Sequence, residues 1–440
     1  MTALINGNGD RKRATGLGFH EYQELKTSVH RELITKVDLE KIATVRDARV
    51  RSQVFTVVQD LVENLNTAMS AAERDRLARE VLDEVFGLGP LEPLLQDPTV
   101  NDILVCGPKS VYVERFGVLE RSNTMFKDNA HLMHIIERIV SAIGRHVDES
   151  SPMVDARLAD GSRVNVIIPP LAIDGAQLSI RRFGQVPITQ DDLLAKQTLT
   201  PSMMEVLRGA VKARLNIVIS GGTGAGKTTM LNVLSGFISD KERIVTIEDS
   251  AELQLKQSHV VRLECRPANV EGKGAIMQRQ LLINSLRMRP DRIIMGECRG
   301  EEAMDMLQAM NTGHDGSMTT VHANNPTDAI SRMETMSMMG NISLSEKAIR
   351  RQIASAISIV IQCSRFPDGS RRVTHISEVT GVTQDSVVMQ DIFSYIQAGV
   401  SPEGKVLGAF GATGVRPRFA DKLKSSGVVL PPDAFEPPDH

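Results

Sequence analysis

Tryptophan is absent from this 440-residue chain, and aromatic residues make up only 3% of it. A protein that stacks bases or sugars on its side chains usually carries more aromatic residues, so the composition argues against such a surface. Cysteine is also scarce, and its wide spacing excludes a disulfide framework and a paired metal-binding motif. We expect all four cysteines to be reduced. They are Cys106, Cys265, Cys298 and Cys363.

Long hydrophobic runs and an excess of one charge are missing as well. No apolar run approaches the roughly 18 residues that a transmembrane helix requires, and the polar start of the chain is unlike a secretion signal. The 51 basic and 54 acidic residues give a net charge of −3, which disfavours a generally basic nucleic-acid binder. We therefore expect a cytoplasmic protein with no transmembrane segment and no nucleic-acid partner.

The residue pattern changes several times along the chain, and each change predicts a boundary. Apolar residues first recur at helical spacing with almost no Gly or Pro, and short alternating strands with one helix then follow. The expected regions are a flexible lead-in (1–18), a helical N-terminal domain (19–90), a small α+β domain (91–183), a linker (184–200) and a domain of alternating helices and strands with a Gly/Pro-rich tail (201–440).

Helix and strand patterns alternate after residue 201, which predicts a parallel sheet covered by helices and an α/β fold class. Near residues 357–376 two strand patterns flank Pro367-Asp368-Gly369, which indicates a hairpin with a tight turn. Past residue 400 the chain is rich in Gly and Pro. We expect much of that tail to be poorly ordered.

A glycine-rich segment between a strand pattern and a helix pattern predicts a phosphate-binding loop. It reads GGTGAGKT and fits the motif G-x-x-x-x-G-K-[ST] at every fixed position. Glycines let backbone N–H groups converge on phosphate oxygens, the Lys227 ammonium reaches the β- and γ-phosphates, and the Thr228 hydroxyl can ligate Mg²⁺. The alternative, a turn without a ligand, is disfavoured by the flanking strand and helix. The candidate ATP-binding residues are Gly221, Gly222, Thr223, Gly224, Ala225, Gly226, Lys227, Thr228 and Thr229.

Two acidic residues come directly after apolar strand patterns. Ile244–Ile247 is followed by Glu248, and Ile293–Met295 is followed by Gly296 and Glu297. Ligands of parallel α/β sheets bind outside the carboxyl ends of the strands. We assign Glu297 to Mg²⁺ or its water and Glu248 to the attacking water, although the two roles, including metal binding, can be exchanged. Acids at strand ends also serve as helix caps, an alternative that two such acids behind one phosphate loop make less attractive.

Histidines and arginines supply further candidates. His322 ends a strand pattern on the same edge, where it can sense the γ-phosphate or hold the Mg²⁺ shell, and His314 is a weaker candidate. Neither has a Cys partner, which disfavours zinc. Four of the arginines before the linker are candidates as well, because arginine suits phosphate oxygens. From periodicity alone a plain surface position is favoured for them. They are Arg157, Arg163, Arg181 and Arg182, and a second arginine group near Glu297 (Arg287, Arg289, Arg292 and Arg299) is a candidate for a subunit boundary.

Four segments together carry a family resemblance. GGTGAGKT (221–228), TIED (246–249), MGECRG (295–300) and TGH to TVHAN (312–324) occur in this order. The set resembles the Walker A, Asp box, Walker B and His box of the type II/type IV secretion ATPase superfamily, whose members drive secretion systems, type IV pili and archaella. DGSRVN (160–165) and SIRRF (179–183) are similar to the family's nucleotide-facing arginine segments.

Within the superfamily, the chain most resembles the CpaF-type ATPases of tight-adherence (Tad) pili, on its helical N-terminal extension and its ATGVRP segment (412–417). The resemblance implies a RecA-like P-loop ATPase domain, use of ATP and Mg²⁺, and nucleotide contacts from Arg163, Arg181 and Arg182. It also implies a homo-hexamer that works on inner-membrane platform proteins, held at the cytoplasmic face through those partners, to assemble or also to retract a pilus. Two other functions stay open: a nucleic-acid motor on the same core, and a nucleotide-gated scaffold without hydrolysis.

Overall fold

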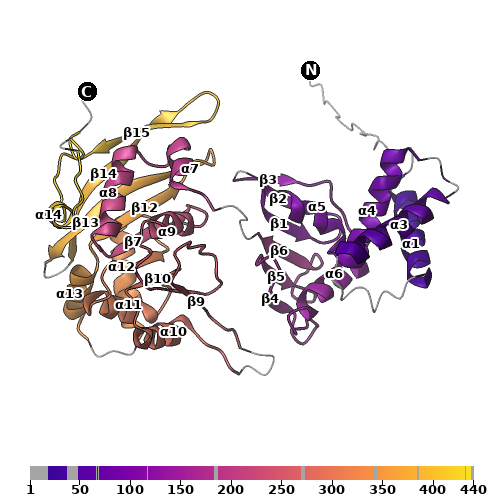
Figure 1. The fold of residues 1–440 in the computed structure, drawn as a ribbon, viewed down its shortest axis with the longest axis horizontal. Coiled ribbons are helices and arrows are strands. Elements are labelled where there is room, and N and C mark those ends of the chain that lie inside the picture. Colours follow the sequence, from indigo (N-terminus) through magenta and orange to yellow (C-terminus); the bar gives the residue numbers. More distant parts are fainter. Residues whose placement is uncertain are drawn as a thin grey trace, which may run out of the picture. The chain divides into compact units, whose positions relative to one another are not determined.

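The computed structural model of the chain divides between residues 183 and 184 into two compact units, which we describe separately (Figure 1). Most of the predicted lead-in, residues 1–17, lies outside the described residues. No helix in the described part of the chain is both long and apolar enough to cross a bilayer. The described residues are 18–36, 48–65, 67, 69–115, 117–182, 187–268, 273–340, 344–383, 386–431 and 433–437.

Three helices open the first unit and pack around their own apolar cluster. The last of them begins at a capping box, in which the Ser70 side chain accepts from the backbone N–H of Glu73 and the Glu73 side chain accepts from that of Ser70. It ends at Gly87. Buried Leu33, Val58 and Leu77 belong to the shared core. The helices are α1 (Phe19–Lys36), α3 (Ala48–Glu63) and α4 (Ala71–Phe86).

A six-stranded antiparallel sheet follows in the same unit, in the order β3-β2-β1-β6-β5-β4. The first three strands pair in sequence as an antiparallel meander, in the span where short alternating strands were expected. Helix α6 covers the sheet through its buried apolar face. The elements are a 3₁₀ turn (Gly89–Leu91), α5 (Glu92–Gln96), β1 (Val100–Cys106), β2 (Val111–Arg115), β3 (Val118–Arg121), α6 (Asn129–Ser141), β4 (Met153–Arg157), β5 (Arg163–Ile167) and β6 (Gln177–Arg181).

The second unit is built on a nine-stranded sheet in the order β15-β14-β13-β12-β7-β11-β10-β8-β9. Pairing is parallel from β12 to β9 and antiparallel from β12 to β15. The strands are β7 (Ile217–Gly221), β8 (Ile244–Glu248), β9 (Val260–Glu264), β10 (Arg292–Met295), β11 (Met318–Val321), β12 (Ile359–Arg365), β13 (Arg371–Val382), β14 (Val387–Val400) and β15 (Val406–Ala412).

Helices cover both faces of this sheet, which confirms the predicted α/β class (Figure 1). Side chains of β7 alternate between the two cores: Ile217 and Ile219 pack with α8, α9 and α14, and Val218 packs with α11, α12 and α13. The helices are α7 (Gln190–Ala195), α8 (Pro201–Lys212), α9 (Lys227–Ser235), α10 (Gln278–Ser285) with a 3₁₀ turn (Leu286–Met288), α11 (Glu302–Asn311), α12 (Pro326–Met338), α13 (Glu346–Ala356) and α14 (Ala420–Ser425).

The tail is folded over its described residues 401–431 and 433–437, so the expectation of poor order was wrong for them. β15 pairs with β14, and Phe419 and Leu423 are buried in the core beside α8. The Glu378 carboxylate accepts from the backbone N–H groups of Arg418 and Phe419 at 3.0 and 2.9 Å, which fixes the start of α14. Several of the Gly and Pro residues in this segment form turns, and the apolar side chains between the turns pack against the core.

Helix α7 lies inside the span expected to be a linker. Its Leu193 is buried in the core of the second unit, so this part of the span is a folded element of that unit.

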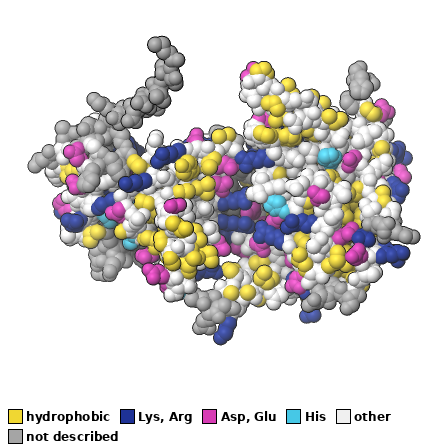
Figure 2. All heavy atoms as spheres, turned by 180° about the vertical axis from the view of Figure 1, so that it is seen from behind, with side chains coloured by type: hydrophobic (Ala, Val, Ile, Leu, Met, Phe, Trp, Pro, Cys, Tyr) yellow, Lys and Arg dark blue, Asp and Glu magenta, His cyan; other side chains and the backbone are white. Residues whose placement is uncertain are grey.

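The β14–β15 hairpin projects from the second unit and carries hydrophobic side chains on its surface (Figure 2). Ile396, Val400 and Leu407 on it are 70%, 57% and 51% exposed.

Candidate functional site

The phosphate loop connects the end of β7 to the start of α9, at the carboxyl edge of the parallel strands. Glycine is required at Gly221, since a Cβ atom there would lie 2.5 Å from the carbonyl oxygen of Cys363 on β12. Gly226 caps α9 with φ +95°, a left-handed conformation that favours glycine. The sequence motif thus folds as a strand, a tight loop and a helix N-terminus, the geometry that binds phosphate.

Two donors converge inside this loop. The Lys227 Nζ atom donates to the carbonyl oxygen of Gly222 at 3.1 Å, and the Ala225 N–H donates to the same oxygen at 3.3 Å. Lys227 is 8% exposed, so its charge lies largely shielded from water. Thr228 and Thr229 stand half-buried in the first turn of α9. A phosphate oxygen that binds these two donors would meet an ammonium and a backbone N–H together.

Strand order explains which side chains reach the loop. β11 is the direct neighbour of β7, β10 lies next to β11, and β8 lies next to β10. Residues that follow these strands therefore lie at one edge, at increasing distance from the loop: His322, then Glu297, then Glu248 and Asp249.

A continuous chain of polar contacts joins the four motifs at this edge. Thr223 Oγ1 of the loop lies 3.2 Å from His322 Nε2, and His322 Nδ1 lies 3.1 Å from Glu297 Oε1. Arg299 Nη2 then donates to Glu297 Oε2 at 2.8 Å, and Arg299 Nη1 pairs with Asp249 Oδ2 at 2.8 Å. A change at the phosphate loop can thus be transmitted through one histidine to an acid, an arginine and a second acid.

The two partners of His322 set its tautomer. Because the Glu297 carboxylate can only accept, Nδ1 carries the proton and Nε2 accepts from the Thr223 hydroxyl. Burial, and then the positive charge of Lys227, lower the pKa of His322 below its ordinary value. His322 is therefore neutral at pH 7, in a form that passes a hydrogen bond from the loop to Glu297.

Glu248 is held differently from the other acid. It is 2% exposed, and its Oε1 accepts from the backbone N–H groups of Glu252 and Leu253 at 2.8 and 2.9 Å. Its Oε2 is buried and has no hydrogen-bond partner among the residues that the structure describes. Burial raises the pKa of Glu248 above its ordinary value. One oxygen thus anchors the loop after β8, and the other is available to a ligand or a water molecule.

Mg²⁺ fits the donors at this edge. The described ranges contain no group of three or more His, Cys, Asp or Glu side chains that could hold a metal ion by themselves. Mg²⁺ does not need such a cage, since it keeps several waters and uses one or two protein oxygens together with substrate phosphates. The Thr228 hydroxyl, the Glu297 carboxylate and the unpartnered Glu248 Oε2 are oxygen ligands of this kind.

His314 and Arg292 lie away from this edge. His314 precedes β11, at the end opposite to His322, and its Nδ1 lies 3.3 Å from the Ala309 carbonyl oxygen. Arg292 begins β10, is 1% exposed and donates to both carboxylate oxygens of Glu242 at 2.8 and 3.0 Å. Arg292 is therefore a buried structural side chain, and its expected place at a subunit boundary was wrong.

The four candidate arginines of the first unit fall into two groups. Arg157, Arg163 and Arg181 are cross-strand partners on β4, β5 and β6, so they form a row on one face of the sheet. Arg182 instead donates through Nη1 to the carbonyl oxygens of Asp97 and of Val100, the latter at 3.1 Å. Arg182 thus ties the sheet to the chain before β1, while the other three form a row that continues to Asp102 on β1.

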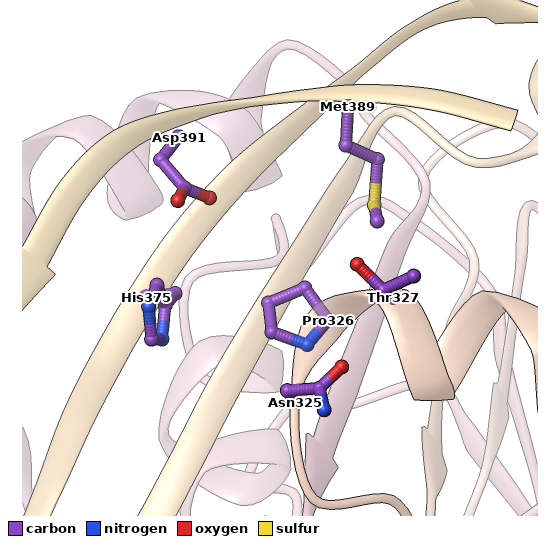
Figure 3. Close-up of a pocket in the computed structure, with 6 residues that line it drawn as sticks. All are labelled: Asn325, Pro326, Thr327, His375, Met389 and Asp391. Atoms are coloured by element: carbon purple, nitrogen blue, oxygen red, sulfur yellow. The ribbon is translucent and has the colours of Figure 1, made fainter.

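Sequence reasoning missed the partnership of Asp249 with Arg299, although both residues stand in the motifs. It also missed a cavity of about 300 Å³ beside the start of α12 (Figure 3). Its lining comes from α12 and its cap and from β13 and β14, so it is separate from the phosphate loop. The lining residues are Asn325, Pro326, Thr327, His375, Met389 and Asp391.

Comparison with known proteins places all four motifs inside one family match. Residues 84–387 match the family described as Type II/IV secretion system protein. A Mycobacterium tuberculosis (strain H37Rv) protein provisionally named for conjugal transfer is 41% identical over 307 residues, 68% of this chain and 86% of that protein. The conjugal transfer protein TrbB of Rhizobium radiobacter is 31% identical over 311 residues, 70% of this chain and 91% of that protein. The crystal structure of the VirB11 ATPase from the Brucella suis type IV secretion system, in complex with sulphate, is 27% identical, covers 66% of this chain and 96% of its own, and has a TM-score of 0.37.

Proposed function

Because the chain belongs to the Type II/IV secretion system protein family, we propose that it is a Mg²⁺-dependent ATPase that drives a secretion or pilus machine. The observation that carries this proposal is the chain of contacts from Thr223 through His322, Glu297 and Arg299 to Asp249. Such a chain at the edge of a phosphate loop can couple the state of a bound triphosphate to side chains on three neighbouring strands.

The residues divide the work of hydrolysis as follows. The loop N–H groups and Lys227 bind and orient the phosphates. Mg²⁺, when bound, neutralises phosphate charge, and the Thr228 hydroxyl with Glu297 would hold it. Glu248, through its free Oε2, accepts the proton of the attacking water. His322 links the loop hydroxyl of Thr223 to Glu297 and so responds to the terminal phosphate.

We further propose that the active form is a homo-hexamer of the CpaF type, which works on inner-membrane platform proteins of a Tad-like pilus from the cytoplasmic side. The helical extension before the small α+β domain and the ordered tail support this branch. In the hexamer the arginine row Arg157, Arg163 and Arg181, with Arg163 and Arg181 foremost, supplies charge to a nucleotide.

A second candidate machine is a conjugal transfer system, since two relatives at 41% and 31% identity are named for conjugal transfer. Deleting the gene and scoring both piliation and conjugation in the same strain separates the two candidates. Loss of pili alone supports the pilus, and loss of conjugation alone supports the transfer system.

ATP turnover tests the proposed activity. Phosphate release by the purified chain should require both ATP and Mg²⁺ and should be abolished by Lys227→Ala, with an unchanged circular dichroism spectrum. Light scattering with an ATP analogue should give about six times the chain mass of 48.2 kDa. An ATPase rate that Lys227→Ala leaves unchanged refutes the assignment, and nucleotide binding without any turnover favours a gated scaffold.

A further inference from the structure

The hairpin of β12 and β13 brings two arginines to the phosphate loop. β12 is the second neighbour of β7, with Cys363 in register with Gly221, so its end lies beside the loop. Arg365 ends β12, Arg371 begins β13, and the two are direct cross-strand partners. Because directly opposed residues of an antiparallel pair share one face of the sheet, both guanidinium groups lie on the same side of the hairpin.

Both side chains contact the loop. Arg371 Nε donates to the carbonyl oxygen of Gly224 at 2.8 Å. A Cβ atom on Gly224 would lie 3.2 Å from Arg365 Nη1, and one on Gly226 would lie 3.5 Å from Arg371 Cδ. The glycines of the motif therefore admit the hairpin arginines as well as phosphate.

The contact with Gly224 has a geometric consequence inside the loop. In a trans peptide the C=O and N–H groups point in opposite directions. Holding the Gly224 carbonyl therefore directs the N–H of Ala225 away from Arg371, toward the point where Lys227 Nζ also donates. Arg371 orients a phosphate donor without pointing at the phosphate itself.

The pair also brings two positive charges to the loop. A guanidinium is the side chain best suited to phosphate oxygens. A polyanion bound in the loop would therefore meet favourable charge from both side chains that contact it.

We propose that Arg365 and Arg371 form a cationic brace of the phosphate loop that strengthens nucleotide binding within the same subunit. Arg371 is a positioning residue that sets the Ala225 N–H, and Arg365 contributes charge. This inference rests on the proposed function, because it takes the ligand of the loop to be a nucleotide.

Charge-removing variants with a matched control test the brace. Arg371→Met and Arg365→Met each remove one guanidinium, and Arg372→Met removes the same charge one residue further along β13. Arg372 donates to the carbonyl oxygen of Lys196 at 3.1 Å and follows Arg371 on the strand, so it faces the other way. The measurements are ADP affinity by fluorescence titration, KM and kcat for ATP, and the urea midpoint without nucleotide.

The brace predicts that Arg371→Met weakens ADP binding about tenfold or more and raises KM more than it lowers kcat. Arg365→Met should weaken ADP binding by a smaller factor that shrinks at high salt. Arg372→Met should stay within about twofold of wild type, and all urea midpoints should agree. Arg365→Lys should restore most of the affinity, whereas Arg371→Lys should not, since lysine cannot reproduce the Nε contact.

Two results overturn the brace while leaving the ATPase proposal intact. One is wild-type ADP affinity in both methionine variants. The other is a loss of affinity that is matched in Arg372→Met or accompanied by an equal drop in the urea midpoint, which shows a structural effect. A wild-type chain that binds no ADP refutes the proposed function and the brace together.

Discussion

Replacing Glu248 separates its structural contacts from its chemistry. Alanine removes the acceptor of two backbone N–H groups, those of Glu252 and Leu253. Leaving two buried donors unpaired should lower the free energy of unfolding by about 3 kcal/mol. Glutamine keeps an acceptor oxygen in the same position, so Glu248→Gln should stay within about 1 kcal/mol of wild type.

The two variants should nevertheless share one defect in turnover. Neither carries a carboxylate at the position of Oε2, and loss of a general base costs about 10²- to 10⁴-fold in rate. Nucleotide affinity should persist in Glu248→Gln. Phosphate release at saturating ATP, fluorescence titration with ADP and urea unfolding measure the three quantities on the same samples.

The raised pKa of Glu248 also predicts how the stability difference between Glu248→Gln and wild type changes with pH. Because its folded-state pKa is raised, its contribution to stability is full below the ordinary pKa and is lost as pH rises through the raised value. The stability of Glu248→Gln relative to wild type should therefore increase with pH. A kcat for Glu248→Gln within a few-fold of wild type would refute the assigned role, and Glu297 would then be the acid to test.

Three further perturbations test His322, Arg292 and the cysteines. The folded-state pKa of His322 is lowered, so the wild type should lose stability as pH falls below about 6.5, and His322→Gln should lack this loss. Because the side chain is 37% exposed, solvent screening limits the difference in stability to about 1 kcal/mol between pH 7.5 and 5. Urea unfolding that gives the two proteins the same dependence of stability on pH would contradict this prediction. Arg292→Met removes one of the two arginines that pair with the Glu242 carboxylate and leaves Arg214 at 2.9 Å, so it should lower the free energy of unfolding by about 1–3 kcal/mol; an unchanged urea midpoint would show that the Arg292 pair contributes little. Iodoacetamide should label exposed Cys106 in the native protein but not Cys298, whose burial raises the pKa of its thiol to about 12, and mass spectrometry that finds both labelled at equal rates would contradict the buried position.

Local signals predicted the central part of the site from sequence. Strand β10 (Arg292–Met295) contains the apolar run Ile293–Met295 that predicted a strand, since a short apolar run between turn residues favours a buried strand. The phosphate loop was predictable since Gly224 and Gly226 adopt positive φ angles, which the local backbone favours for glycine. Both depend on residues close together in the chain.

The partners within the site were beyond such reasoning. Glu248 and Asp249 are consecutive, and consecutive side chains at a strand end point in opposite directions. Which of them meets Arg299 depends on how the strand is oriented in the sheet, and the structure selects Asp249. The approach of Arg371 to Gly224 likewise depends on the register between β12 and β13, over 147 residues of sequence separation.

The tail shows the same limit. Gly and Pro past residue 400 predicted disorder, yet strand pairing with β14 and burial of Leu423 hold this segment in place. Such tertiary contacts outweigh local composition, because they bury apolar surface that a loose tail would leave in water.

A crystal structure with Mg²⁺ and a non-hydrolysable ATP analogue would show where the nucleotide binds. We expect the triphosphate in the loop 221–228, with Lys227 Nζ within hydrogen-bond distance of the terminal phosphates and with Glu248, Glu297 and His322 gathered around the γ-phosphate. A nucleotide bound elsewhere, or a γ-phosphate with none of these three side chains near it, would refute the proposed ATPase site.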